Sequence, residues 1–148
     1  MVYNMNYRLM TENDIQKVVH LYIDYYNDKE DAEWTEQTTE KRILQILLKP
    51  DSYCLICENQ DGIIAFAIGY FEQYDDCFAY DLVEVVVKTD LQNKGIGTEF
   101  MNEIEKRVKE KSAMLIQLQA VNDKHHNHFY IKLGYKDCSN LVLKSKIL

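Results

Sequence analysis

The chain lacks the features that would place it in a membrane or divide it into parts. No apolar run in its sequence reaches the roughly 18 residues that a membrane-spanning helix needs. No internal repeat, low-complexity tract or linker interrupts it, and its start lacks the charged-then-apolar order of a secretion signal. We therefore expect one soluble, cytoplasmic domain over residues 1–148, with a single core and no membrane partner, since this length is a common domain size.

Clusters of basic residues are also missing from the sequence. The chain carries 17 Lys and Arg residues against 24 Asp and Glu residues, for a net charge of −7. Proteins that bind DNA or RNA usually present a basic face that neutralises the phosphates. The composition therefore argues against a nucleic-acid partner.

Cysteine is present, but its spacing does not predict a metal site. Cys54 and Cys57 form a Cys-x-x-Cys pair, and Cys77 and Cys138 are the other two. Residues 53–58 are rich in apolar side chains and indicate a strand, on which positions three apart face opposite sides of the sheet. The two sulfurs of the pair then cannot reach one ion. We expect four reduced thiols and no metal.

The hydrophobic pattern predicts alternating strands and helices. Strands are expected at residues 5–10, 53–58, 63–70, 78–87 and 114–121. A first helix should follow Thr11, because Asp14 lies where a capping box places an acid. A second helix should begin at Thr38 or Thr39 and end at Pro50. The first four strands suggest an antiparallel meander.

The second half of the chain adds two helices and a final pair of strands. Apolar residues recur four positions apart from Ile96 to Val108 and form the buried stripe of a helix. A shorter helix is expected at residues 124–133, followed by paired strands at 135–137 and 141–146. The predicted fold is an α+β or mixed α/β three-layer domain.

A glycine turn, Gln92-Asn93-Lys94-Gly95-Ile96-Gly97, joins the strand at 78–87 to the helix that follows. Its glycines permit a close approach to the backbone. The first N–H groups of the helix are free and point outward together, with the positive end of the helix dipole behind them. Such a turn suits phosphate, so we expect a ligand that carries a pyrophosphate.

Dinucleotide-binding domains and nucleotide triphosphatases also place a glycine turn between a strand and a helix, but they fit this chain poorly. Phe100 stands where the dinucleotide motif has its third glycine. Thr98 and Glu99 stand where a triphosphatase has Lys and then Ser or Thr. The turn also lies in the second half of the chain, which is late for either class.

A longer pattern around the turn resembles the acyl-CoA signature of the GCN5-related N-acetyltransferase (GNAT) superfamily. In that signature a Val precedes a short acidic turn and then Gln/Arg-x-x-Gly-x-Gly/Ala, as in residues 87–97 here. Asn122 and the run at 128–135, His-Phe-Tyr-Ile-Lys-Leu-Gly-Tyr, are similar to a later segment of the family. Two motifs in the expected order rarely coincide by chance. Thr89 departs from the pattern, which often has Pro there.

The resemblance implies a fold and an activity. The fold is a central, mostly antiparallel sheet flanked by helices, whose fourth and fifth strands run parallel and splay apart to admit the pantetheine arm of acetyl-CoA. A buried unpaired backbone amide costs on the order of 1–3 kcal/mol, so splayed strands suit a ligand rich in amides. The implied activity is transfer of the acetyl group to a primary amine by direct attack in a ternary complex.

The resemblance also assigns contacts to the cosubstrate. Main-chain N–H groups of residues 93–98 would hold the pyrophosphate, and the main chain at Val85 and Val87 would pair with the acetyl carbonyl and pantetheine. Asn122 would approach the pantetheine from the fifth strand. The full expected set is Val85, Val87, Gln92, Asn93, Lys94, Gly95, Ile96, Gly97, Thr98 and Asn122. Lys94 is left open between a phosphate contact and a solvated surface residue.

The reaction needs a group that removes a proton from the amine, one that stabilises the oxyanion and one that protonates the departing thiolate. Tyr130 matches the family tyrosine near the CoA sulfur and is the expected general acid. Glu84 is the expected base, directly or through water, with the Val85 N–H facing the oxyanion. Asp81, placed on the opposite face by strand parity, is the alternative base. Without the motif, Tyr130 would be a core ring and Glu84 a solvent-facing strand residue.

Three histidines, His125, His126 and His128, stand where the family usually has small or apolar residues. His125 and His128 share one helix face, but no third ligand is suggested, so a metal is not expected. A role in proton transfer or substrate contact and a plain polar helix face are both left open.

An acidic and aromatic stretch, residues 24–36, lies between the first two predicted helices. Carboxylates beside aromatic faces attract ammonium groups, and in the family this region lines the acceptor side of the cleft. The expected acceptor contacts are Tyr25, Tyr26, Asp28 and Trp34. A small polycationic amine, such as a polyamine or an aminoglycoside, is the expected substrate. A protein lysine or N-terminus is the alternative acceptor, and a solvated loop is the plain alternative for the stretch.

Two functions from different classes remain at this point. One is an acetyl-CoA-dependent N-acetyltransferase, and the other is a catalytically idle acyl-CoA-binding regulatory domain of the same fold. Tyr130, Asn122 and a carboxylate in the fourth strand favour the enzyme, because a sensor needs none of them. The acceptor, the acyl-chain length and the formation of a homodimer are left open.

Overall fold

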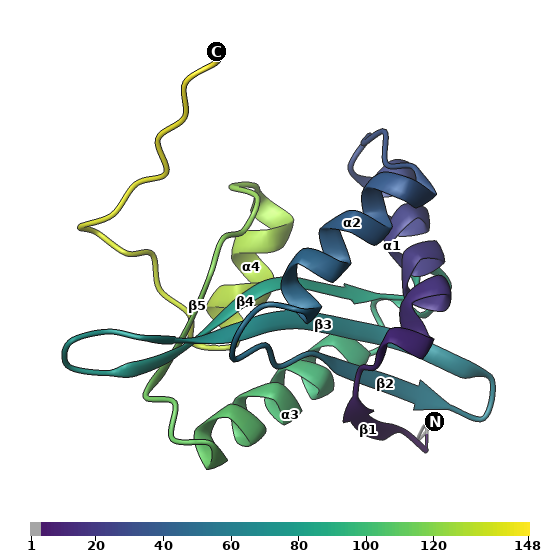
Figure 1. Cartoon of the computed structure of the whole chain (residues 1–148), viewed down its shortest axis with the longest axis horizontal. Coiled ribbons are helices and arrows are strands. Elements are labelled where there is room, and N and C mark those ends of the chain that lie inside the picture. The colour runs from purple at the N-terminus through teal and green to yellow at the C-terminus, as the bar shows by residue number, and fades with distance from the viewer. Residues whose placement is uncertain (1–3) are drawn as a thin grey trace.

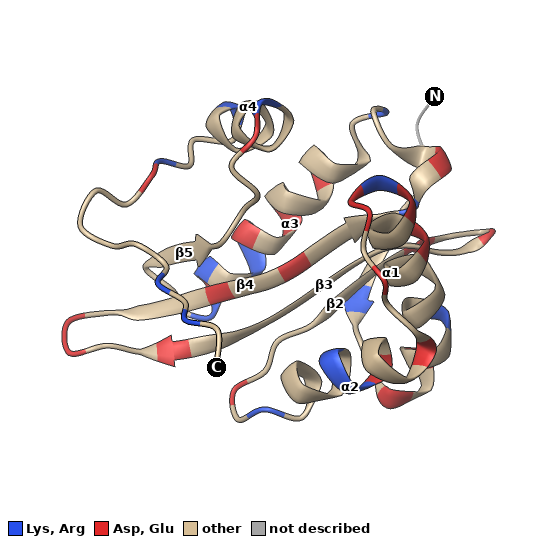
Figure 2. Cartoon of the chain, turned by 90° about the horizontal axis from the view of Figure 1, so that it is seen from above, with Lys and Arg blue, Asp and Glu red and all other residues tan. Residues whose placement is uncertain are grey.

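The computed structural model describes residues 4–148 and contains one five-stranded sheet with helices on both faces (Figure 1). The strands are β1 (Asn6–Leu9), β2 (Leu55–Asn59), β3 (Gly62–Gln73), β4 (Phe78–Val87) and β5 (Leu115–Leu118). The helices are α1 (Ile15–Lys29), α2 (Glu36–Leu47), α3 (Ile96–Glu110) and α4 (Lys124–Lys132), with 3-10 turns η1 (Glu12–Asp14) and η2 (Thr89–Leu91). Viewed from above, the hairpin that joins β3 to β4 projects beyond the helices (Figure 2).

The strands are ordered β1-β2-β3-β4-β5 across the sheet. Neighbours from β1 to β4 are antiparallel, whereas β4 and β5 run parallel. The expected antiparallel meander and the parallel final pair are therefore confirmed. The α+β fold with a mostly antiparallel sheet is confirmed with them.

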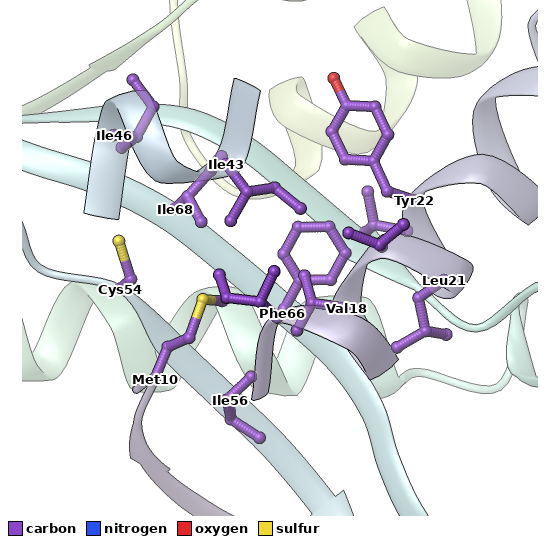
Figure 3. Packing of buried hydrophobic residues seen from close by; sticks show 13 residues of the cluster. Met10, Val18, Leu21, Tyr22, Ile43, Ile46, Cys54, Ile56, Phe66 and Ile68 are labelled. Atoms are coloured by element: carbon purple, nitrogen blue, oxygen red, sulfur yellow. The ribbon is translucent and has the colours of Figure 1, made fainter. Parts of the chain in front are cut away.

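Two apolar cores fill the space between the three layers, so the expectation of a single core is wrong. In the α1–α2 core, Val18, Tyr22 and Ile43 of the helices pack against Phe66 and Ile68 of β3, and each is at most 1% exposed (Figure 3). On the opposite face lies the α3 core, whose fully buried helical members include Phe100, Met101 and Ile104. The sheet is therefore covered on both faces, and the cysteine pair divides between them as predicted: Cys54 lies in the α1–α2 core and Cys57 in the α3 core.

Side-chain contacts mark the starts of η1, which leads into α1, and of α2. Thr11 and Asp14 form the predicted capping box, and Arg8 clamps the Asp14 carboxylate through two hydrogen bonds of 2.9 Å. The predicted start of the second helix is wrong by a few residues, because Thr35 is the cap and its Oγ1 accepts from the Thr38 N–H at 3.1 Å. The helix then ends at Leu47, ahead of Pro50. Several polar residues in this stretch are able to cap a helix, so propensity alone did not select Thr35.

A β-bulge in β4 decides which way its side chains face. Ile68 pairs with Glu84 and Gly69 pairs with Leu82, so Val83 is an extra residue on β4. Val83 packs in the α1–α2 core, and Glu84 beside it also faces α1 and α2. Alternation is interrupted at this point, as it is at most bulges. The Tyr80 side chain can lie against the backbone of Gly69 because glycine has no Cβ, and a Cβ at this position would overlap the Tyr80 side chain.

The bulge makes the parity argument for Asp81 wrong. The Asp81 carboxylate accepts a hydrogen bond from the Tyr70 hydroxyl at 3.2 Å, and the Lys49 ammonium, which follows α2, lies 4.3 Å from the centre of the Tyr70 ring. Asp81 and Glu84 therefore face the same side of the sheet. The two carboxylates are separated along β4 and do not lie on opposite faces of the sheet.

Two predictions for the last part of the chain are also wrong. The fifth strand covers only Leu115–Leu118, so Asn122 lies in the loop before α4 rather than on a strand. The paired strands expected at residues 135–137 and 141–146 are absent from the described residues, and 135–148 contain no helix or strand. An alternating apolar pattern identifies a segment that suits a strand, but a strand also needs a neighbour to pair with.

Candidate active site

A cleft of about 480 Å³ opens where β4 and β5 separate. The two strands pair only from Ala79 to Leu82 of β4, and β4 then continues to Val87 while β5 ends at Leu118. The cleft is lined by β4 residues 82–87, by parts of the glycine turn, by residues 118–121, and by Tyr25, Tyr26, Glu30, His125, His126, Phe129, Tyr130 and Lys132. One end therefore meets the start of α3, and the other meets the end of α1.

The hydrogen bonds of β4 show which of its main-chain groups face the cleft. The Lys88 N–H donates to the Ile64 carbonyl of β3 at 2.8 Å, so alternate residues along β4 bond to β3. The main-chain groups of Val85 and Val87 then point away from β3 and toward β5, where the cleft lies. The Val87 carbonyl accepts from the Gln92 side chain at 3.1 Å. The Val85 carbonyl and the N–H groups of both residues face the cleft.

The glycine turn presents a set of free amides at one end of this cleft. Gly95 is the residue before α3 and has a φ of 83°, a left-handed conformation that favours glycine. The first helical bond is donated by the Glu99 N–H to the Gly95 carbonyl, which leaves the N–H groups of residues 95–98 without helical acceptors. With the helix dipole behind them, these amides form an anion site.

The expected cosubstrate contacts divide between the cleft and its surroundings. Val85, Val87, Gln92, Asn93, Gly95, Gly97 and Thr98 line the cleft. The Ile96 side chain is 2% exposed in the α3 core, so only its main chain is available to a ligand. Lys94 and Asn122 do not line the cleft, and the Asn122 side chain accepts a hydrogen bond from Asn127 at 3.0 Å.

Glu84 is held at the cleft by three donors from α1 and α2. The Tyr22 hydroxyl and an Arg42 Nη each donate to its carboxylate at 3.2 Å, and the Tyr26 hydroxyl donates to the other oxygen. Burial, followed by the nearby Glu84 carboxylate, raises the pKa of Tyr22 and of Tyr26. Both tyrosines therefore stay protonated as donors, and they fix the position of the carboxylate.

Tyr130 lies in the cleft wall on α4. Its ring packs edge-on against Phe129 and Tyr135, with ring centres 5.0 and 5.7 Å away. Burial, and secondarily the charge of Glu84, raises the pKa of Tyr130. Tyr130 therefore holds its proton at neutral pH, as a group that donates a proton must.

A polar cluster closes the end of the cleft near α1. The Tyr25 hydroxyl donates to the Glu30 carboxylate at 2.9 Å, and the His126 Nε2 lies 3.4 Å from that carboxylate. The other ring nitrogen of His126 is 2.8 Å from an Asp123 oxygen. Contacts of both ring nitrogens with carboxylates link α4 to the end of α1 across the cleft mouth.

The structure places the remaining predicted site residues as follows. Tyr25, Tyr26, His125 and His126 line the cleft, whereas Asp28, Trp34 and His128 do not. The Trp34 ring packs edge-on against Tyr22, with ring centres 5.0 Å apart, and belongs to the α1–α2 core. Glu30 is the one acidic residue of the stretch 24–36 that lines the cleft, and its spacing of four residues from Tyr26 at the end of α1 was the available signal.

Residues 50–137 match the family model of the acetyltransferase (GNAT) domain, and the chain belongs to this family. The "Uncharacterized protein YxbD" of Bacillus subtilis is 33% identical over 87 residues, which cover 58% of this chain and half of that protein's length.

Two solved structures illustrate the shared fold. A possible acetyltransferase from Clostridium difficile aligns with a TM-score of 0.83 at 15% identity, covering 97% of this chain and 98% of the other. An aminoglycoside N-acetyltransferase in complex with CoA aligns with a TM-score of 0.75 at 12% identity, covering 99% of this chain and 97% of the other.

Within residues 4–148, no helix has both the length and the apolar character needed to cross a membrane. Nor do three His, Cys, Asp or Glu side chains gather as a metal site anywhere in that part.

Proposed function

We propose that this protein is an acetyl-CoA-dependent N-acetyltransferase that acts on a small cationic amine. The observation that supports this most is the convergence of three kinds of group in one cleft. Free amides at the start of α3 lie at one end, main-chain groups of Val85 and Val87 follow the wall, and Glu84 and Tyr130 line the same space. Family membership supports acetyl-CoA as the donor.

The residues present fit acetyl-CoA on structural grounds. The free N–H groups of residues 95–98 suit its pyrophosphate, and the unpaired main chain of β4 suits a ligand with amide groups. Acetyl-CoA supplies an activated acetyl group as a thioester. Val85 and Val87 would hold the pantetheine end, and the Val85 N–H would face the oxygen that gains negative charge.

Three steps then fall to the protein's own groups. Glu84 accepts the proton that the acceptor ammonium must lose, directly or through a water molecule, so that the nitrogen can attack the acetyl carbon. The Val85 N–H stabilises the charge that develops on the carbonyl oxygen. Tyr130 donates its proton to the sulfur as the carbon–sulfur bond breaks. After the attack the nitrogen loses its second proton, which restores Tyr130, so the products are the N-acetylated amine, CoA with a free thiol and the proton that Glu84 passes to solvent.

The charges at the α1 end favour a cationic acceptor. Glu30 and Glu84 are carboxylates that line the cleft, and Tyr25 and Tyr26 place aromatic rings beside them. Aromatic faces beside carboxylates attract ammonium groups. A structural relative at 12% identity acts on aminoglycosides, and this supports including that class among the acceptors.

Calorimetry and a coupled assay test the proposal. The purified protein should bind acetyl-CoA and CoA, and it should release CoA when offered one or more of a panel of polyamines and aminoglycosides. If no small amine reacts, mass spectrometry of protein substrates tests a lysine or N-terminal acceptor. Absence of binding to both acetyl-CoA and CoA overturns the proposal. Binding without transfer to any acceptor identifies the protein as an idle acyl-CoA-binding domain instead.

A further inference from the structure

Glu30 and Glu84, the carboxylates that line the cleft, differ in how their charge is balanced. Glu84 is paired with the Arg42 guanidinium at 3.2 Å and also accepts from two tyrosine hydroxyls. Glu30 accepts from the Tyr25 hydroxyl at 2.9 Å, and among the described residues the basic side chain paired with it is His126 alone. An imidazole, unlike a guanidinium, is not permanently charged at neutral pH. Glu30 is therefore the carboxylate whose charge is left for a ligand.

The contact between Glu30 and His126 is the longer of the two that the imidazole makes. Its Nε2 lies 3.4 Å from Glu30, beyond the length of an ordinary hydrogen bond, whereas its Nδ1 lies 2.8 and 2.9 Å from the two Asp123 oxygens. Asp123 also caps α4 by accepting from the His126 main-chain N–H at 2.8 Å. His126 therefore stays attached to Asp123 when another cation takes its place at Glu30.

The surroundings of Glu30 suit an ammonium group of a ligand. The Glu30 side chain is 25% exposed and that of His126 is 19% exposed, so both are partly withdrawn from water. Tyr25 lines the cleft beside Glu30, and its ring packs edge-on against Tyr26 with ring centres 4.9 Å apart. An ammonium that is partly shielded from solvent binds a carboxylate and an aromatic face more strongly than an exposed one does. It also forms shorter, charge-assisted hydrogen bonds than the present contact with His126.

The spacing along α1 relates Glu30 to the reacting groups. Tyr26 donates to Glu84, and Glu30 follows Tyr26 by four residues at the end of the helix. Residues four apart lie on the same helix face, on the order of 6 Å apart along the axis. Glu30 is therefore about one helical turn beyond the residue that holds Glu84. One acceptor molecule can thus place one nitrogen near Glu84 and a second nitrogen at Glu30.

We propose that Glu30 makes the enzyme selective for diamines. It binds the second ammonium of an acceptor whose first nitrogen reacts near Glu84, and this ammonium replaces the His126 ring. The inference rests on the proposed acetyltransferase function and adds the substrate class, which is a primary amine with a second ammonium on a short aliphatic spacer. A monoamine leaves Glu30 in contact with His126. Glu30 is thus a specificity-determining residue, and His126 competes with the substrate for it.

The first test compares 1,4-diaminobutane with butylamine in steady-state assays. In the unaltered protein kcat/KM should be roughly tenfold or more higher for the diamine, as a charge-assisted contact allows. Glu30→Gln should lower this ratio by roughly tenfold, because the amide still accepts from Tyr25 but has lost the charge. Glu33→Gln removes the same charge from an exposed position outside the cleft lining and should leave the ratio unchanged. A ratio near one in the unaltered protein, or a ratio that Glu30→Gln does not change, overturns the proposal.

His126→Ala distinguishes competition from a structural role of the imidazole. The variant removes the ring and keeps the main-chain N–H that Asp123 accepts. If the ring competes with the ligand, KM for 1,4-diaminobutane should fall by roughly threefold relative to KM for butylamine. If the ring only holds α4 in place, the two KM values should change together, and the proposal fails. Thermal melting of the variant verifies that it remains folded.

Calorimetry on the protein saturated with CoA, which has no acetyl group to transfer, separates this inference from the proposed function. 1,4-Diaminobutane should bind the unaltered complex roughly tenfold more tightly than the Glu30→Gln complex. If this difference is found but no amine is acetylated in the assays, the proposed function fails and the ammonium site at Glu30 is supported. If amines are acetylated but the diamine binds both complexes equally, the proposed function stands and the role of Glu30 is refuted.

Discussion

Tyr26 of α1 donates a hydrogen bond to the Glu84 carboxylate of β4 and so joins the α1 end of the cleft to the strand that borders it. Arg42 of α2 donates to the same carboxylate at 3.2 Å, and the Glu84 side chain is 14% exposed. A carboxylate fixed from two helices is positioned rather than free to rotate. Its removal should therefore be visible in catalysis.

Glu84→Gln keeps the size of the side chain and removes its charge. If Glu84 accepts the proton of the acceptor, kcat/KM for the amine should fall by roughly 10²-fold, the lower end of what general base catalysis contributes. CoA affinity should stay within a factor of about two, because the anion site at α3 is untouched. Steady-state assays and calorimetry measure the two quantities.

Asp81→Asn is the control for Glu84→Gln. Asp81 faces the same side of the sheet but lies outside the cleft lining, hydrogen-bonded to Tyr70. Turnover should be nearly unchanged. A larger loss with Asp81→Asn than with Glu84→Gln would assign the base to Asp81 after all.

Tyr130→Phe removes the hydroxyl that should protonate the departing thiolate. We expect kcat to drop by roughly 10²-fold while CoA binding persists, since the ring still fills its place against Phe129 and Tyr135. Tyr135→Phe is a matched control, because the Tyr135 hydroxyl is buried without a hydrogen-bond partner. That variant should keep its turnover. Equal turnover in both variants would remove Tyr130 from the mechanism.

The two glycines at the start of α3 should respond differently to alanine. Gly95 has a φ of 83° and no neighbouring atom within 4 Å of an added Cβ, so Gly95→Ala should cost about 1 kcal/mol through backbone strain alone. A Cβ at Gly97 would meet Phe129 and Val87 at 3.6 and 3.7 Å, which is ordinary contact.

Gly97→Ala should therefore preserve the free energy of unfolding or raise it by about 0.5–1 kcal/mol, because alanine favours the helix. It should still weaken CoA binding, since its methyl group lies in the cleft wall. Urea titration and calorimetry on the same samples separate the two effects. Unaltered CoA affinity in Gly97→Ala would mean that the ligand does not approach the backbone there.

Asp14 makes stability depend on pH. Hydrogen bonds from Arg8, and then from Thr11, lower the pKa of this carboxyl against the opposing effect of burial. Because the folded pKa lies below the unfolded value of about 3.9, its contribution is full above that value and is lost as the pH falls through the folded pKa. Asp14→Asn should cost about 1–3 kcal/mol at pH 7.

The deficit of Asp14→Asn should shrink as the pH is lowered below about 4, where the unaltered protein loses the same contribution. Urea denaturation at several pH values measures it. Glu12→Gln, an exposed neighbour in the same turn, is the control and should show neither effect. A deficit that is constant down to pH 2 would contradict the assigned role of the carboxylate.

Local patterns predicted most of the fold, and the failures have identifiable causes. The stripe from Ile96 to Val108 located α3, and the glycine turn located the anion site, because both depend on residues close together in the sequence. The local sequence does not predict the extra residue at Val83, because the position of a bulge depends on the pairing of β4 with β3. This is why Asp81 was assigned to the wrong face.

The α1 end of the cleft shows the same limit. Glu30 and His126 are far apart in the sequence and meet only because α4 returns to the end of α1. The acidic stretch was recognised from composition, but composition does not tell which of its side chains turn inward. Trp34 turned toward the α1–α2 core and Glu30 toward the cleft.

The bulge gives β4 two neighbouring side chains where a regular strand would have one. A single residue at that point would have to choose between filling the interior and presenting a charge to a ligand. With two, Val83 packs against the α1–α2 core while Glu84 presents its carboxylate to the cleft from the neighbouring position. Core packing and contact with the cleft are thus divided between two consecutive residues. A deletion of Val83 would leave Glu84 as the single residue at this point of β4.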